Sequence, residues 1–215
     1  MKAYRVHEYG DAAKFIEDEV NKPSAKQGHV VVEVKASSLN PIDHKLLKSD
    51  LGINPALPGI LHMDVAGVIT EVGEGVTAFK TGDEIYGCAG GLQGEAGNIE
   101  GALADFMLAD SNLIALKPKS LSFSESAALP LVTITAWEGL FDRAHIKKED
   151  HVLIHGGAGG VGHIAIQLAR QHGARVATTV SSEDKAKVAR GLGAEDIIFY
   201  RDEKVEDYTQ RLTKC

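Results

Sequence analysis

The sequence predicts an α/β protein whose first part is all-β and whose second part is half of a doubly wound parallel sheet. In the first part, short apolar segments such as residues 30–36 and 64–72 are separated by turn residues, which is typical of a small barrel or sandwich. Beyond residue 150, strand patterns alternate with helix patterns, the order expected for parallel strands joined by helices. We therefore expect two domains, residues 1–123 and 124–215.

Further strands are expected in the first domain at residues 82–87, 102–108 and 113–116. We expect short strands and turns there, with no long helices. The stretch between residues 90 and 101 is rich in glycine and is either a plain mobile connection or an active-site flap.

The second domain is predicted to begin with a helical region that starts near Ser124, breaks near Pro130 and continues to Ala144. Strands at residues 152–154, 175–180 and 196–200 then alternate with helices after residue 160, at 183–190 and at 205–214. A complete sheet of this type needs about three more strands. We therefore expect the chain to be a fragment of a longer protein, with an apolar and unpaired edge on its first parallel strand.

A glycine-rich loop joins the first parallel strand to its helix. Gly157, Gly159 and Gly162 match G-x-G-x-x-G in the strand-then-helix context that this pattern requires. The first glycine permits a tight turn, the second lets the backbone approach a pyrophosphate, and the third allows close packing of helix on strand. Free N–H groups at the helix start favour a phosphate. The predicted cofactor-binding residues of this loop are Gly157, Ala158, Gly159, Gly160, Val161 and Gly162.

The end of the second parallel strand indicates which dinucleotide is bound. An NAD site usually has an acidic residue there, but this sequence has Ser181 and Ser182, with Lys185 three residues later. Small hydroxyl side chains and a lysine suit a 2′-phosphate. Glu183 and Asp184 argue the other way, although acids also suit a helix N-terminus. We favour NADPH over NADH.

Composition limits the other partners and the cellular setting. The net charge of −7 disfavours an extended face for nucleic acid or anionic membranes, and no apolar run approaches the ~20 residues that cross a bilayer. The N-terminal residues lack the apolar stretch of a signal peptide. Two cysteines, Cys88 and Cys215, give no disulfide framework, so we expect a cytoplasmic protein.

Several motifs together resemble the medium-chain dehydrogenase/reductase superfamily, and more narrowly its zinc-lacking quinone oxidoreductase (zeta-crystallin-like) branch. The motifs are Asn40-Pro41-Ile42-Asp43, Gly-Ile-Leu-His-Met-Asp-Val-Ala-Gly at residues 59–67, Ala128-Leu129-Pro130, Thr135-Ala136-Trp137 and the glycine loop. The resemblance implies a GroES-like catalytic domain, then a Rossmann domain that is only partly present, with the active site in the cleft between them. It also implies that Thr135 contacts the nicotinamide end of the cofactor, that Tyr200 flanks the adenosine end, and that the protein is a homodimer.

By the same resemblance, the three positions that hold catalytic zinc in other relatives are Asn40, Met63 and Leu131 here. None of these side chains is a competent zinc ligand. His44, His62 and Asp64 could in principle bind a metal together, although such residues more often serve the fold. We expect a site without metal.

Without zinc, the expected reaction is hydride delivery from NADPH to a quinone or an α,β-unsaturated carbonyl, because conjugation spreads the arriving charge. Asn40 is the expected amide donor near the nicotinamide and the substrate oxygen. Lys45 either supplies a second donor or positive charge, or is a surface lysine; Asp43 either orients its neighbours or caps a helical turn. Two alternatives stay open: a zinc-type alcohol dehydrogenase, and a cofactor-binding fragment without turnover.

Overall fold

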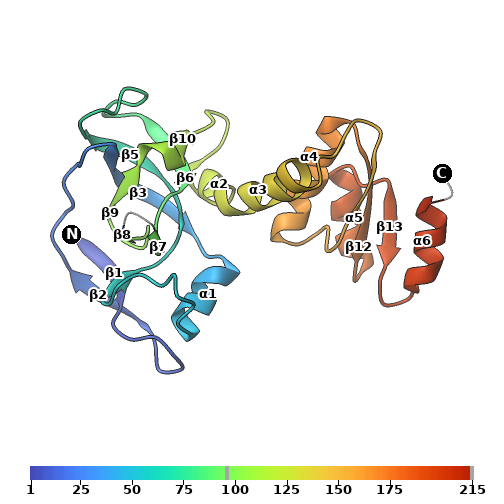
Figure 1. The fold of residues 1–215 in the computed structure, drawn as a ribbon, viewed down its shortest axis with the longest axis horizontal. Helices are drawn as coiled ribbons and strands as arrows, with labels where there is room; N and C mark the ends of the chain where they lie inside the picture. Colours follow the sequence, from blue (N-terminus) through green and yellow to red (C-terminus); the bar gives the residue numbers. More distant parts are fainter. Residues whose placement is uncertain (95–96, 214–215) are drawn as a thin grey trace. The chain divides into compact units, whose positions relative to one another are not determined.

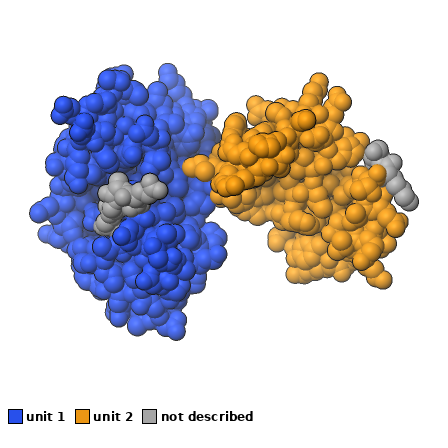
Figure 2. Space-filling view, viewed as in Figure 1, with its two compact units in different colours: residues 1–131 blue, residues 132–215 orange. Residues whose placement is uncertain are grey.

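The computed structural model describes residues 1–94 and 97–213, which divide into two compact units, Met1–Leu131 and Val132–Cys215 (Figure 2). The boundary expected from the change in sequence pattern lies earlier, at residues 123 and 124. The difference arises because the first helix after it, α2 (Phe123–Ala127), packs on β3 and β5 of the first unit and buries Ser126 and Ala127 there. A helical pattern therefore begins before the first unit has ended.

The first unit is built on antiparallel sheets (Figure 1). The largest has the strand order β10-β6-β5-β3-β9, and a second has the order β2-β1-β4. The bounds are β1 Lys2–Val6, β2 Phe15–Glu19, β3 His29–Ser38, β4 Gly59–Ile60, β5 Asp64–Val72, β6 Glu84–Cys88, β9 Phe106–Asp110 and β10 Ile114–Leu116. Alternate residues of the long strands, such as Val30 and Val32 of β3, enter one hydrophobic core. The 3-10 helix η1 (Ser111–Leu113) precedes β10.

Two features of this unit differ from the expected run of strands. Helix α1 (Pro41–Lys48) follows β3, with Asn40 as its N-cap, proline at its first position and Asp43 in its first turn. These are helix-start signals, but only eight residues follow and the apolar pattern is short. In the glycine-rich stretch, β7 (Leu92–Gly94) pairs with β8 (Gly97–Ile99). Residues 95–96 of that stretch lie outside the described part of the chain.

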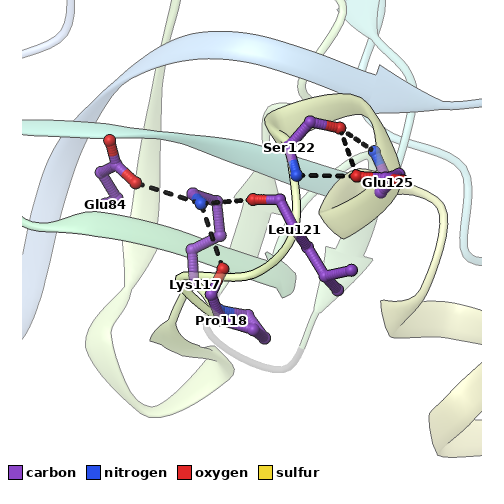
Figure 3. A network of polar contacts seen from close by, with 6 residues as sticks. All are labelled: Glu84, Lys117, Pro118, Leu121, Ser122 and Glu125. Carbon is purple, nitrogen blue, oxygen red and sulfur yellow. Dashed lines mark hydrogen bonds and ion pairs between the residues drawn. The ribbon is translucent and has the colours of Figure 1, made fainter.

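A buried lysine fixes the passage from β10 into α2 (Figure 3). The Lys117 ammonium donates to the carbonyl oxygens of Pro118 at 3.1 Å and Leu121 at 2.6 Å, and pairs with Glu84 at 3.1 Å. Immediately after this turn, Ser122 and Glu125 form a capping box that starts α2. The sequence pattern placed the start of the helix at Ser124, but the helix begins one residue earlier, at Phe123, with Ser122 as its N-cap.

The second unit holds a parallel sheet in the order β11-β12-β13. The alternation expected from the sequence is confirmed: β11 (His151–Ile154), α4 (Gly160–His172), β12 (Arg175–Val180), α5 (Glu183–Gly191), β13 (Asp196–Phe199) and α6 (Val205–Thr213). Gly173 ends α4 in a left-handed conformation, φ 93°. Ahead of the sheet, α3 (Pro130–Trp137) continues into a π-helical turn, η2 (Glu138–Arg143). Among the described strands, β11 lies at one edge of the sheet.

Within residues 1–94 and 97–213, no helix has both the length and the apolar character that crossing a membrane requires.

Candidate cofactor and substrate site

The glycine loop between β11 and α4 is held in place by the neighbouring strand β12. The N–H of Gly156 donates to the Thr179 hydroxyl at 2.9 Å, and the N–H of Gly157 donates to the Thr179 carbonyl at 3.2 Å. The hydroxyl of Thr178 donates to the Ile154 carbonyl at 2.6 Å, at the end of β11. Both threonine side chains are buried. One short segment of β12 therefore fixes both the end of β11 and the start of the loop.

Two of the predicted glycines have no room for a side chain. A Cβ on Gly157 would lie 2.2 Å from the Thr178 hydroxyl, and a Cβ on Gly162 would lie 2.3 Å from the Gly156 carbonyl oxygen. Gly160 differs, because a Cβ there would meet Val132 at an ordinary 3.5 Å. Gly157 is thus packed closely against Thr178 of β12, and Gly162 is packed closely against the backbone of the loop itself.

The first turn of α4 is suited to an anion. Gly159 is the N-cap and provides no side-chain cap, and no acidic residue occupies the first turn. The N–H of His163 makes the first bond of the helix, to the Gly159 carbonyl. The N–H groups of Gly160, Val161 and Gly162 precede it, and such groups at a helix start can bind a phosphate.

A hydroxyl and ammonium cluster lies at the end of β12. The Lys185 ammonium donates to the Ser181 hydroxyl at 3.1 Å, and the Ser182 hydroxyl caps α5. The two acids that argued against a phosphate have cationic neighbours: Glu183 pairs with Arg190 at 2.8 Å, and Asp184 lies 3.8 Å from Lys187. Local cations therefore offset much of their negative charge.

Tyr200 follows the next strand, and its N–H reaches the Val180 carbonyl at 3.4 Å, which places the ends of β12 and β13 side by side. Its ring is half exposed, and the Arg201 guanidinium lies 5.9 Å from the ring centre. The structure thus brings together Tyr200 and the serines at the carboxyl end of the sheet, where doubly wound sheets bind ligands.

Thr135 lies on α3 with its side chain exposed. Val132, one helical turn earlier, is the residue that a Cβ on Gly160 would contact. Residues three apart share a helix face, so Thr135 lies on the side of α3 that faces the start of α4.

The predicted catalytic residues of the first unit lie at the end of β3 and in α1. The Asp43 carboxylate accepts from the N–H of Asn40 at 2.7 Å, so Asp43 caps the helix. Asn40 is only 6% exposed, and its side-chain nitrogen donates to Asp64 at 2.9 Å and to the Ser38 hydroxyl at 3.3 Å. Lys45 is exposed on α1. The roles of the three residues in catalysis stay predictions.

A buried carboxylate that sequence reasoning considered only as a metal ligand joins this group. Asp64, at the start of β5, accepts from Asn40, from the Ser38 hydroxyl and from the N–H of Leu131. Burial raises the pKa of Asp64, against hydrogen bonds that lower it. An acid at the head of an otherwise apolar strand was a signal in the sequence that could have marked it.

Two further titratable groups lie beside Asp64. Burial, together with the nearby Asp64 carboxylate, raises the pKa of the Cys88 thiol to about 12. Burial lowers the pKa of His62, which Asp43 and Asp64 partly offset. The His62 ring nitrogen Nδ1 lies 3.1 Å from the Ser37 hydroxyl. In the described part of the chain, no three His, Cys, Asp or Glu side chains gather as a metal site would require.

Two family models match the sequence. Residues 26–119 match the alcohol dehydrogenase GroES-like domain, and residues 160–215 match a zinc-binding dehydrogenase domain. The chain belongs to the medium-chain dehydrogenase/reductase superfamily. Its GroES-like barrel and partial Rossmann-type sheet are confirmed.

Relatives in this superfamily match across nearly the whole chain. A 2-methylene-furan-3-one reductase of Solanum lycopersicum is 40% identical over 96% of the chain and 54% of its own length. An NADPH-dependent alkenal/one oxidoreductase of Arabidopsis thaliana is 37% identical over the same shares. The quinone oxidoreductase of Rattus norvegicus is 34% identical over 94% of the chain and 59% of its own length.

Solved structures agree with this relationship. An alcohol dehydrogenase superfamily protein from Novosphingobium aromaticivorans superposes with a TM-score of 0.90 at 39% identity. The Escherichia coli quinone oxidoreductase complexed with NADPH superposes with a TM-score of 0.83 at 29% identity. In both cases the whole chain matches 63% of the other protein. The chain therefore spans little more than half of the curated relatives and about two thirds of these structures.

Proposed function

We propose that this protein is an NADPH-dependent reductase that acts without zinc. It transfers hydride to a quinone or to the activated C=C bond of an α,β-unsaturated carbonyl. The observation that supports this proposal most directly is that the second unit has two sites suited to binding a phosphate group. These are the start of α4, free of acidic side chains, and the Ser181–Lys185 contact at the end of β12. The names of the relatives support the reaction class, because they include quinone, alkenal/one and furanone reductases.

The residues present fit a nicotinamide dinucleotide phosphate. In this proposal the N–H groups of Gly160, Val161 and Gly162 bind the pyrophosphate. Ser181, Ser182 and Lys185 bind the 2′-phosphate, and Tyr200 covers the adenosine end. Thr135 contacts the nicotinamide end. The cofactor, when bound, supplies the hydride, and the protein orients it and excludes competing reactions.

The acceptor's oxygen gains negative charge when hydride reaches a conjugated carbon, so it needs a donor. We assign this role to the Lys45 ammonium, which is exposed on α1. The Asn40 amide is a weaker candidate than the sequence suggested, because its nitrogen already donates to Asp64 and Ser38. We keep the homodimer as an expectation, which sedimentation velocity tests.

The cofactor assignment is tested by binding. Ser182→Ala combined with Lys185→Glu removes a hydroxyl and reverses a charge, so the Kd for NADPH should rise at least tenfold while the Kd for NADH changes little. Lys187→Glu is the matched control, because it makes the same charge change on α5 two residues away. Isothermal titration calorimetry measures the Kd for each of the two cofactors. An unchanged Kd for NADPH in the double variant would refute the 2′-phosphate site.

The reaction is tested by following NADPH oxidation with 1,4-benzoquinone and with an enone. Turnover that survives exhaustive chelation, in protein shown by elemental analysis to be free of zinc, supports the proposal. Turnover that requires stoichiometric zinc would instead favour the alcohol dehydrogenase reading, which the name of the second matching family model keeps open. NADPH binding without any turnover would favour a cofactor-binding protein.

A further inference from the structure

The Asp64 carboxylate is buried and accepts hydrogen bonds from several separate segments of the first unit. It is 0% exposed. One oxygen accepts from the N–H of Leu131 at 2.9 Å, in the first turn of α3. The other accepts from the Ser38 hydroxyl at 2.8 Å and from the Asn40 amide at 2.9 Å. The Cys88 thiol, on the paired strand β6, also donates to it.

Stability alone does not explain this residue. Burying a carboxylate is unfavourable unless cations or hydrogen-bond donors compensate its charge. The charge of Asp64 is supported by hydrogen bonds from the Asn40 amide, the Ser38 hydroxyl and the N–H of Leu131. Burial itself works against the ionised form.

The chemistry of the carboxylate determines how the Asn40 amide lies. An ionised carboxylate only accepts hydrogen bonds, so the NH2 end of the amide must face it. The second hydrogen of that NH2 group is directed at the Ser38 hydroxyl at 3.3 Å. Asn40 is also the N-cap of α1, and its own N–H is held by Asp43. Asn40 is therefore fixed both in its side chain and in its backbone.

We propose that Asp64 is a positioning residue, which locks the Asn40 amide with its nitrogen toward the protein and so fixes the start of α1, the helix that presents Lys45. The consequence for catalysis rests on the proposed function: Asn40 organises the site, and Lys45 is the donor to the acceptor's oxygen. The orientation of the Asn40 amide does not rest on it.

The experiment compares Asp64→Asn with Thr70→Val in the 215-residue chain by NMR. Asp64→Asn keeps the size of the side chain but places an NH2 group where the carboxylate accepted. Thr70→Val is the matched control, because it removes one hydroxyl hydrogen bond, to the Val31 carbonyl, from the same strand. The side-chain NH2 signals of Asn40 are assigned by their loss in Asn40→Asp.

We expect the Asn40 NH2 protons to exchange with solvent at least tenfold faster in Asp64→Asn, or to shift as the amide turns over, and to stay as in the wild type in Thr70→Val. Unchanged protection and shifts in a folded Asp64→Asn protein would overturn the proposal. If Asp64→Asn does not fold, Ser38→Ala decides. One of the two NH2 protons should then stay protected by Asp64, and loss of protection at both would overturn the proposal.

A kinetic readout separates positioning from a general structural effect. Asp64→Asn should lower kcat at least tenfold and leave the Kd for NADPH unchanged. In an Asn40→Ala background the same substitution should lower kcat by less than a further twofold, because both changes remove the same contact. Effects that multiply would contradict action through Asn40. If the wild-type chain shows no turnover, the proposed function fails for this chain, while the NMR result still decides the role of Asp64.

Discussion

Cys88 illustrates how a single side chain takes its chemistry from its neighbours. It lies directly across from Asp64 in the pairing of β5 with β6. Burial and the neighbouring carboxylate raise the pKa of its thiol to about 12. The thiolate is the reactive form of cysteine, so at neutral pH Cys88 is a protonated and unreactive thiol.

The residue-scale prediction concerns alkylation. In the folded protein at pH 7.5, N-ethylmaleimide should label Cys88 at least a hundredfold more slowly than in urea, as measured by mass spectrometry of the peptide that contains it. The peptide that contains Cys215 must be quantified separately. Asp64→Asn should speed the labelling of Cys88, because it removes the negative charge that disfavours the thiolate. Equal labelling rates in folded and unfolded protein would contradict the assignment.

At the scale of elements, the segment from β11 to α4 shows which sequence signals were sufficient to predict local structure. The glycine spacing and the 3.6-residue apolar period lie within one contiguous segment, so local sequence predicted the strand, loop and helix. The anchoring of the loop by Thr178 and Thr179 was not predicted, because these residues are more than twenty positions away. For α1 the sequence indicated only the alternative of a helical turn capped by Asp43, because the capping signals are clear but eight residues give little periodicity.

The element-scale prediction compares two glycines of the same loop. Gly162→Ala forces a Cβ to within 2.3 Å of the Gly156 carbonyl, so the loop must shift. We expect a loss of about 1–3 kcal/mol in the free energy of unfolding and at least tenfold weaker NADPH binding. Gly160→Ala is the control for the unfolding measurement, because its Cβ meets only an ordinary contact within the protein. Urea unfolding measures the change in stability, and isothermal titration calorimetry measures the affinity of Gly162→Ala for NADPH. Equal free energies of unfolding for the two variants would count against close packing at Gly162.

At the scale of the whole molecule, acid should weaken the first unit through His62. Burial lowers the pKa of this imidazole below its ordinary value of 6.5, so the unfolded state binds a proton more readily than the folded state. Stability is therefore complete above pH 6.5 and is lost as the pH falls from 6.5 toward the lower pKa of the folded state. Asp64 has the opposite sign, because its raised pKa favours the folded state at low pH.

His62→Asn tests this dependence, since asparagine tolerates the left-handed backbone at this position, φ 72°, and does not titrate. Hydrogen exchange of the buried amides of β3 and β5 gives the free energy of opening between pH 7.5 and 5. The wild type should lose more stability than His62→Asn over this range. Parallel curves for the two proteins would show that His62 is not responsible.

The sequence by itself determined the class of each half of this protein, because strand alternation, helix period and the glycine loop are all encoded by residues close together in the chain. It also selected the residues proposed for the cofactor, since strand ends and helix starts carry their own signals. Only the tertiary structure decided how the first unit's polar residues are used. Ser38, Asn40, Asp64, Cys88 and Leu131 come from separate segments, and burial around one carboxylate is what makes them a single network.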